Sequence, residues 1–231
     1  MGLVSLSPSL TEILAALGAA DKVTEFPSKP IEFGKIEALS PEWVLADSRD
    51  NRPEEIQVVQ RKWKTKVFDV KRPEEVCDAA AELGRLVHRR HEAGRLIQAL
   101  RDEMGENQKI FAAKEKRRTV LLLWNQPFIT VNFDAYPSRL LEASGGLNVF
   151  REDPLLEFPV EMEDMIEKNP ELLLLSGGPG PFRARHVSEF RRYRIFNRIP
   201  IHLIDGTLLT CYGPQTVEAL KQFRGIYEGL Q

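Results

Sequence analysis

Apolar residues recur at helical spacing along residues 73–116, the longest stretch of the chain with few helix breakers. These residues form two apolar stripes, each with charged positions on the opposite helix face. The first stripe consists of Val76, Ala80, Leu83 and Val87, and the second consists of Leu96, Ile97, Leu100 and Met104. Gly84 and the polar run at 88–91 predict a break. We therefore expect a shorter helix from Pro73 and a longer one over about 91–114, a rod of roughly 36 Å.

Strands and helices alternate on both sides of this stretch. Before it, the pattern predicts strands at 3–6, 22–26, 43–46 and 67–70. It also predicts helices at 31–39, from Pro53, and from a capping box spanning Ser9 to Glu12 as far as Gly18. After it, the pattern restarts, with strands at 119–124, 172–175 and 199–205 and helices at 137–143, 162–168 and 217–227.

This alternation is typical of mainly parallel sheets covered on both faces. The predicted fold class is α/β, with two lobes of mainly parallel sheet joined by a long backbone helix. The lobes are residues 1–72 and 117–231, and residues 73–116 form the helical spine. Ligands of such folds bind beyond the carboxyl ends of the strands, so we expect a ligand cleft between the lobes.

Composition narrows the function classes. The 231 residues are 42% apolar with a formal charge of −2, which favours a folded protein with a core and disfavours a general nucleic-acid binder. No run of about 18 apolar residues predicts a membrane span. The first residues lack the features of a secretory signal, so we expect a cytoplasmic protein if Met1 is native, or a periplasmic or cell-envelope one if a signal peptide has been removed.

Four ordered motifs resemble one family, the solute-binding proteins with a helical backbone, which include receptors for vitamin B12, haem, siderophores and metals. They are VSLSPSLTEIL at 4–14, IEALSPEWVLA at 36–46, WNQPFIT at 124–130 and GGLNVF at 145–150, followed by Asp205-Gly206. The resemblance implies a non-enzymatic protein that binds a small ligand, in particular a corrinoid or another tetrapyrrole or metal chelate. It also implies no covalent cofactor, a monomer, and an ABC permease as a partner.

Within this family, the chain is most similar to a cobalamin-binding-like branch, also called helical backbone metal receptors, through residues 51–55, Pro181-Phe182 and Tyr212-Gly213. That branch tends to carry a Phe-Cys-x-His-Pro loop, whereas this chain has FPSKP at 26–30 and lacks both soft metal ligands. The Val-Gly-Gly loop expected before Ile36 is also missing. We therefore predict no protein metal site, and any metal should arrive inside an organic ligand.

The resemblance and the position of loops after strands assign a set of ligand-binding residues. These are Ser7, Pro8, Phe26, Lys29, Arg49, Asn51, Trp124, Asn125, Gln126, Pro127, Gly178, Pro179, Phe182 and Tyr212. Trp124 ends a predicted strand ahead of a proline turn, where its indole can stack on a flat ligand. The alternative is a core tryptophan that caps a lobe.

The glycine-rich run at 176–181 resembles a phosphate loop only superficially. Pro179 and Pro181 remove amide donors, and no Lys-Ser or Lys-Thr follows, so we expect a ligand-lining loop. No Ser-His-Asp, GxSxG or paired-carboxylate pattern indicates a catalytic residue. The rival interpretation is a cytosolic enzyme or a nucleotide- or anion-binding regulator, which turnover or the lack of it would distinguish.

Several remaining features concern partners and metals. Glu54 or Glu55 in the first lobe and Glu189 in the second are candidates for docking to a permease, as in secreted relatives. Because Glu189 lies among arginines, we expect no tight docking. The arginines at 183–198 fit a solvated helix face, or else a carboxylated or phosphorylated ligand or an acidic partner.

The cysteines and histidines give no metal-site pattern. Cys77 and Cys211 are isolated, and a disulfide between them stays open. His88 and His91 are read as an exposed pair near the helix junction, while His186 and His202 are read as core or surface residues.

Overall fold

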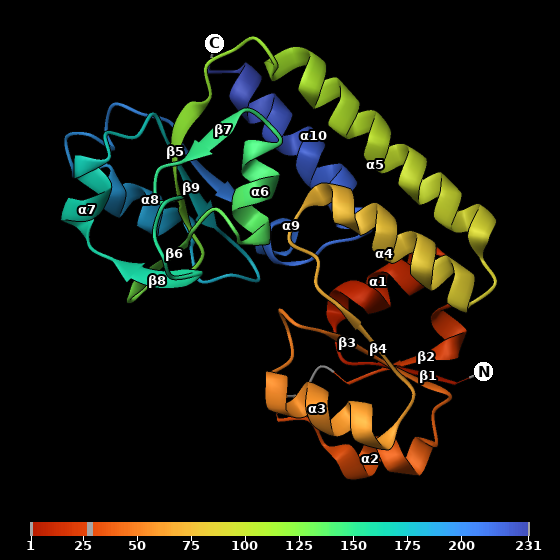
Figure 1. Cartoon of the computed structure of the whole chain (residues 1–231). Helices are drawn as coiled ribbons and strands as arrows, with labels where there is room; N and C mark the ends of the chain where they lie inside the picture. The colour runs from red at the N-terminus through yellow and green to blue at the C-terminus, as the bar shows by residue number, and fades with distance from the viewer. Residues whose placement is uncertain (1, 27–29, 231) are drawn as a thin grey trace. The chain divides into compact units, whose positions relative to one another are not determined.

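The computed structural model describes residues 2–26 and 30–230, which form two compact units. Unit 1 contains residues up to 70, 74–100 and 211–214, and unit 2 contains residues 71–73, 101–210 and 215 onward. In Figure 1, the colour of the ribbon runs from red at the N-terminus to blue at the C-terminus. The two-lobed α/β class with mainly parallel sheets is confirmed, whereas the predicted boundaries at 72 and 116 stay a prediction.

Unit 1 is a four-stranded parallel sheet in the order β2-β1-β3-β4. Its strands are β1 (Leu3–Ser5), β2 (Val23–Glu25), β3 (Trp43–Asp47) and β4 (Thr65–Phe68). The helices α2 (Phe33–Leu39) and α3 (Pro53–Lys62) cover one face, while α1 (Pro8–Ala16) and α4 (Pro73–Leu86) cover the other (Figure 1). A short 3-10 helix, Ala20–Lys22, precedes β2. Both faces of β3 are therefore covered, which explains the uninterrupted apolar run at 43–46 ahead of Asp47.

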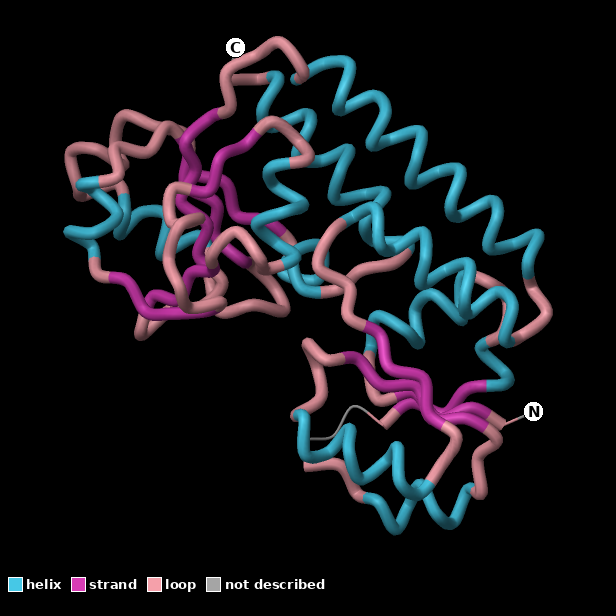
Figure 2. The backbone as a smooth tube through the Cα atoms, viewed as in Figure 1, coloured by secondary structure: helices cyan, strands magenta, loops and turns pink. Residues whose placement is uncertain are grey.

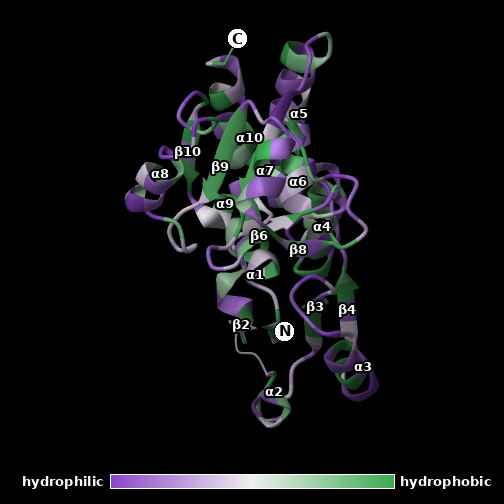
Figure 3. Cartoon of the chain, turned by 90° about the vertical axis from the view of Figure 1, so that its left-hand side faces the viewer, coloured by the Kyte–Doolittle hydropathy of each residue, from purple (hydrophilic) through white to green (hydrophobic). Residues whose placement is uncertain are grey.

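Unit 2 has a second parallel sheet, in the order β10-β9-β5-β7. Its strands are β5 (Arg117–Leu122), β7 (Gly146–Asn148), β9 (Leu172–Ser176) and β10 (Ile201–Ile204). The central strand β9 is buried along its whole length, and Figure 3 shows it in the green of hydrophobic residues. The strands β6 (Phe128–Val131) and β8 (Glu157–Val160) form a separate antiparallel pair.

Helices cover both faces of this sheet as well. On one side lie α7 (Met162–Glu167) and α8 (Ala184–Phe190), and on the other α6 (Tyr136–Glu142) and α10 (Pro214–Glu228), as Figure 2 shows. The short α9 (Gly206–Thr210) follows β10. Phe190 and Met165 from α8 and α7 join Leu173 and Leu175 of β9 in one apolar core.

The long helix α5 (Arg90–Phe111) follows a break at His88, where φ is 58°. Its residues up to Leu100 belong to unit 1, and its residues from Arg101 onward belong to unit 2. In unit 2, the buried Asn107 donates to the Leu220 carbonyl (3.3 Å) and the Ser144 hydroxyl (3.2 Å), and it accepts from Arg224 (3.0 Å). The break and the long second helix were predicted, and His88 and His91 are both exposed beside it.

Three sequence expectations were wrong or incomplete. The first helix begins at Pro8 after Ser7, because proline suits the first turn, so Ser9 is inside the helix and is no cap. The fourth strand is Thr65–Phe68 and not 67–70, because Thr65 pairs with Val44 of β3. The short elements β6, β7, β8 and α9 were not predicted, since they are too brief for a clear period.

Candidate functional site

In each unit, predicted ligand residues gather where the parallel strands end. In unit 1, Ser7 follows β1, Phe26 follows β2, and Arg49 and Asn51 follow β3. We call this set, with Pro8, Asp47 and Asp50, the unit 1 edge. Because the strands are parallel, their carboxyl ends meet at one edge of the sheet, which is where ligands of such sheets bind.

Asn51 braces the unit 1 edge. It is buried, its Oδ1 accepts from the Asp47 backbone N–H (2.9 Å), and its Nδ2 donates to the Leu6 carbonyl (3.0 Å). Ser7 is also buried, and its hydroxyl donates to Asp50 Oδ2 (2.5 Å). Both side chains are thus used to join the ends of β1 and β3.

Tyr212 reaches this edge from far along the chain. Its ring is fully buried, its hydroxyl donates to Asp47 Oδ2, and its backbone N–H donates to the Ser9 hydroxyl (3.2 Å). Burial raises the pKa of Asp47 to about 6, although the hydrogen bonds from Tyr212 and from the Arg49 N–H oppose that rise. Burial and the nearby Asp47 carboxylate raise the pKa of Tyr212 far above its usual range, so Tyr212 keeps its proton and acts as the donor.

The solvent-facing part of the unit 1 edge is small and polar. Arg49 and Asp50 are half-buried, Pro8 is exposed, and the Arg49 guanidinium lies 5.6 Å from the centroid of the Tyr212 ring. Tyr212 therefore holds Arg49 and Asp47 in place from beneath. Phe26 is half-buried against the apolar core of unit 1, and Lys29 lies outside the described residues.

In unit 2, the second set of predicted residues follows β5 and β9. We call residues 124–127 and 177–182 the unit 2 edge. Trp124 is 54% exposed and forms a backbone bridge with Ile129 in the turn that leads to β6. Gln126 and Pro127, joined by a cis peptide bond, are exposed at the tip of this turn. The indole is therefore available for contact and is no core tryptophan.

His186 supports the unit 2 edge, a role that the sequence did not reveal. It is buried, and its Nδ1 accepts from the Arg183 N–H (2.9 Å). The Arg185 Nε–H donates to its Nε2 (3.2 Å), and the Asn125 Nδ2 lies 3.4 Å from the same nitrogen. His186 therefore links α8 to the turn at residues 124–127.

Phe182 is fully buried and meets the His186 ring edge-on, with centroids 5.7 Å apart. Like Tyr212, it lies beneath its edge of the sheet.

The glycine-rich loop after β9 is explained by packing. A Cβ on Gly180 would lie 2.6 Å from the Gly177 carbonyl, and one on Gly206 would lie 2.7 Å from the Ser176 hydroxyl. Gly178 has no atom within 4 Å of such a Cβ, and it is exposed together with Pro179. Gly178 and Pro179 are thus the part of the loop that solvent and ligands can reach.

The docking candidates differ in their local roles. Glu55 caps α3, since its Oε2 accepts from the Arg52 N–H (3.0 Å). Glu54, in the same turn, is exposed, and Glu189 is exposed on α8. The arginine-rich segment is helical only as far as Phe190, so the expectation of a helix face holds for its first part alone.

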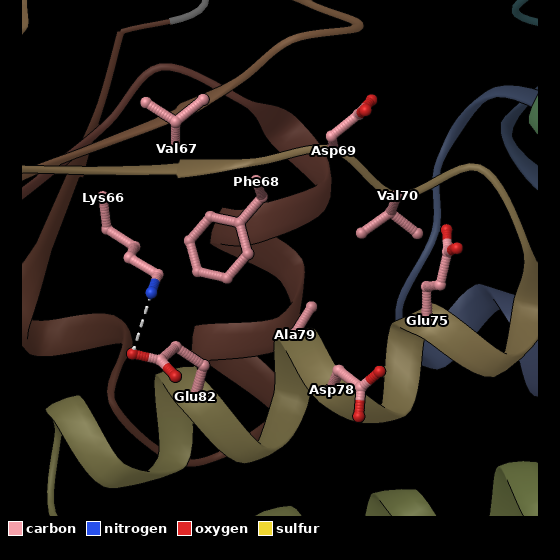
Figure 4. Close-up of a pocket in the computed structure, with 9 residues that line it drawn as sticks. All are labelled: Lys66, Val67, Phe68, Asp69, Val70, Glu75, Asp78, Ala79 and Glu82. Carbon is pink, nitrogen blue, oxygen red and sulfur yellow. Dashed lines mark ion pairs between the residues drawn. The ribbon is translucent and has the colours of Figure 1, made fainter.

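A separate hollow of about 280 Å³ lies between β4 and α4 of unit 1 (Figure 4). Carboxylates of Asp69, Glu75 and Asp78 line it, and Lys66 forms an ion pair with Glu82 across it (3.2 Å). None of the predicted ligand residues lines this hollow. It is therefore not part of the candidate site.

Within residues 2–26 and 30–230, no group of three or more His, Cys, Asp or Glu side chains is arranged to hold a metal ion. Cys77 and Cys211 are not joined in a disulfide. Among the helices described, none has the length and apolar character needed to cross a membrane.

Comparisons with known proteins agree on one family. The family model described as "Periplasmic binding protein" matches residues 27–200. A vitamin B12-binding protein of Vibrio cholerae is 26% identical over 202 residues, which cover 75% of this chain and 70% of that protein.

Solved structures share the fold. The periplasmic vitamin B12 binding protein of Vibrio cholerae superposes with a TM-score of 0.85 at 19% identity, covering 99% of this chain and 97% of the other. A periplasmic heme binding protein of Pseudomonas aeruginosa gives a TM-score of 0.80 at 14% identity, covering 98% and 92%.

Proposed function

Because this chain belongs to the periplasmic binding protein family, we propose that it binds a corrinoid or another flat tetrapyrrole or metal chelate and releases it unchanged. Proteins of this family bind substrates and are not enzymes. Relatives named as vitamin B12-binding and heme-binding proteins support this ligand class.

The exposed indole of Trp124 is the observation that carries the proposal. A side chain of this size with 54% exposure, held by a turn at the carboxyl end of β5, offers a flat apolar face to a ligand. Offset stacking on a conjugated macrocycle suits such a face. Asn125 and Gln126 stand beside it and supply amide groups for the polar rim of a macrocycle.

The unit 1 edge supplies charge instead. Arg49 is a guanidinium donor that pairs well with carboxylates, such as haem propionates, and with the amide oxygens of a corrinoid. Asp50 accepts from Ser7 and is half-buried, so it is a fixed acceptor for ligand amides. In this proposal Tyr212, Phe182 and Asn51 hold these contact residues in position.

The rival interpretation, an enzyme or a nucleotide- or anion-binding regulator, is not favoured. The glycines of the loop after β9 serve close packing around Ser176, and the exposed part contains Pro179, which has no N–H for a phosphate. We propose no catalytic residue and no resident metal.

Delivery to an ABC permease follows from the family. We propose Glu54 as the docking residue of unit 1, because Glu55 is engaged in its helix cap. Glu189 is the candidate in unit 2, and its arginine neighbours keep our expectation that docking is weak. Relatives described as periplasmic favour that location over the cytoplasm. A monomer remains our expectation.

Calorimetry with cobalamin, cobinamide and haem tests the proposal. We expect saturable binding of at least one of them, weakened about tenfold by Trp124→Ala, since aromatic stacking contributes about 0.5–1.5 kcal/mol beyond area burial. Tyr193→Ala is the matched control, because Tyr193 is 42% exposed but lies outside both edges. Equal affinity of the Trp124 variant and the parent would remove Trp124 from the site.

Two further measurements complete the test. Native mass spectrometry of protein from its own host identifies a retained ligand. Incubation with the bound ligand and analysis of the products checks that it is released unchanged, and any turnover would favour the rival interpretation.

A further inference from the structure

The second half of the arginine-rich segment lies away from the unit 2 edge. Residues 191–199 form turns that lead into β10, so they lie near the amino end of that strand. Arg191 holds these turns together, because it donates to the carbonyls of Phe196 (2.8 Å) and Ile199 (2.7 Å). Arg191 therefore has a structural role. The turns that it holds carry the arginines that follow it in the sequence.

Two adjoining hollows run along this end of the sheet. One has a volume of about 420 Å³ and lies between the end of α7 and residues 193–199. The other, about 350 Å³, continues to Arg117 and Arg118 at the start of β5. The two share Asn169, Pro170, Arg198 and Ile199, so they form one elongated depression, which we call the arginine trough.

The trough is basic. Arg194 and Arg198 are exposed, and neither guanidinium has a hydrogen bond or ion pair with any residue that the structure describes. The single carboxylate among the lining residues, Glu171, is already paired with Arg117 (3.0 Å) and Arg118 (3.6 Å). Positive charge along the trough is therefore left without compensation.

The trough is also apolar. Ile166 is 37% and Tyr193 is 42% exposed, and both line the larger hollow with the half-buried Ile195 and Ile199. Large apolar side chains that group beside unpaired arginines are unusual for a merely solvated surface and typical of a contact site.

From these observations, we propose that the arginine trough docks an acidic polypeptide segment that carries an apolar or aromatic side chain. Arg194 and Arg198 pair with its carboxylates, and the apolar side chain occupies the hollow beside Ile166 and Tyr193. The elongated form suits a peptide chain better than a compact ligand. The trough lies at the opposite end of the β-strands of unit 2 from Trp124 and Gly178, so ligand and peptide can be bound together.

Fluorescence anisotropy with a labelled peptide tests this inference. The probe repeats Glu-Asp-Phe-Glu-Leu-Asp twice, and we expect it to bind the full chain with an affinity that falls as salt is raised. The double variant Arg194→Glu and Arg198→Glu should weaken binding about tenfold or more, because two favourable charge pairs become repulsive. Ile166→Ser should weaken it about threefold through lost apolar contact.

Matched controls separate the trough from general charge. Arg101→Glu with Arg192→Glu changes the net charge of unit 2 equally at exposed positions outside the trough and should leave affinity within about twofold. A probe with serine at its apolar positions should bind more weakly.

Two outcomes would overturn the proposal. One is an equal loss in both double variants. The other is equal binding of the serine probe or of single-stranded DNA of the same charge, which would indicate a non-specific polyanion surface.

Discussion

Each unit places an aromatic residue near the carboxyl ends of the strands of its own parallel sheet. The two residues differ in how far they are buried. Tyr212 is fully buried and hydrogen-bonded to Asp47, whereas Trp124 is 54% exposed. Both were predicted to contact a ligand. The difference indicates that the unit 1 edge is built around the buried hydrogen bond from Tyr212 to Asp47, which we call the lock. The unit 2 edge instead offers an apolar surface.

This contrast extends to the surrounding residues. At the unit 1 edge, the side chains of Ser7 and Asn51 make hydrogen bonds that join the strand ends. Arg49 and Asp50 are the charged side chains that can contact a ligand. At the unit 2 edge, Asn125 and Gln126 are uncharged and stand beside the indole. The unit 1 edge therefore offers charged contacts, whereas the unit 2 edge offers an aromatic ring and uncharged amides.

The largest expected effect comes from removing the lock. Tyr212→Ala deletes a large buried ring and leaves Asp47 without its donor, so the free energy of unfolding should fall by about 3–5 kcal/mol. Tyr212→Phe keeps the ring and should lose only about 1–3 kcal/mol. Urea denaturation followed by circular dichroism measures both. A loss below about 1 kcal/mol for the alanine variant would contradict the proposed lock.

The pH dependence of stability sharpens the comparison next. The pKa of Asp47 is about 6 when folded, against an ordinary value of 3.8, so the folded state holds this proton more tightly than the unfolded state does. The contribution of Asp47 to the free energy of unfolding is therefore largest below about pH 4. This contribution, about 3 kcal/mol at most, is lost as the pH rises through about 6.

Asp47→Asn tests this sign. Asparagine still accepts from Tyr212 but does not ionise, so its stability relative to the parent should increase between pH 4 and pH 7. Thermal melts across this range provide the measurement, with Asp50→Asn as a neighbouring control. A difference that does not change with pH would show that Asp47 ionises normally in the folded protein.

Much of the fold was predictable because its signals are local. Buried runs such as 172–175 and the proline-led start of α3 identify elements without knowledge of the partners that cover them. The pair β6 and β8 gave no such signal, because each is four residues long and β8 contains Pro159.

The site was less predictable. Loop positions after strands led to Arg49 and Trp124 as candidate ligand residues, and their role in binding stays a prediction. Asp47 could have been suspected from its position at the end of a buried strand, but its partner Tyr212 is 165 residues away, and this contact exists only in the folded chain. His186 was hidden for a similar reason, since its role depends on contact with Asn125, 61 residues earlier.

Two glycines, Gly206 at the start of α9 and Gly178 at the unit 2 edge, give a smaller effect. Gly206→Ala would place a methyl group 2.7 Å from the Ser176 hydroxyl and 3.0 Å from the Gly177 carbonyl, so it should destabilise by about 1–3 kcal/mol. Gly178→Ala meets no atom within 4 Å and should change stability by less than about 0.5 kcal/mol. Equal effects in chemical denaturation would mean that the loop is not held by close packing.

The smallest effect on stability is expected at Trp124, and it completes the comparison with Tyr212. Trp124 bridges to Ile129 through its backbone, which Trp124→Ala retains, and its exposed ring contributes little to the core. The variant should therefore unfold within about 0.5 kcal/mol of the parent. Denaturation of this variant beside Tyr212→Ala decides the matter. If Trp124→Ala lost about 2 kcal/mol or more, the indole would be structural like the Tyr212 ring, and weaker ligand binding by that variant would no longer identify a contact.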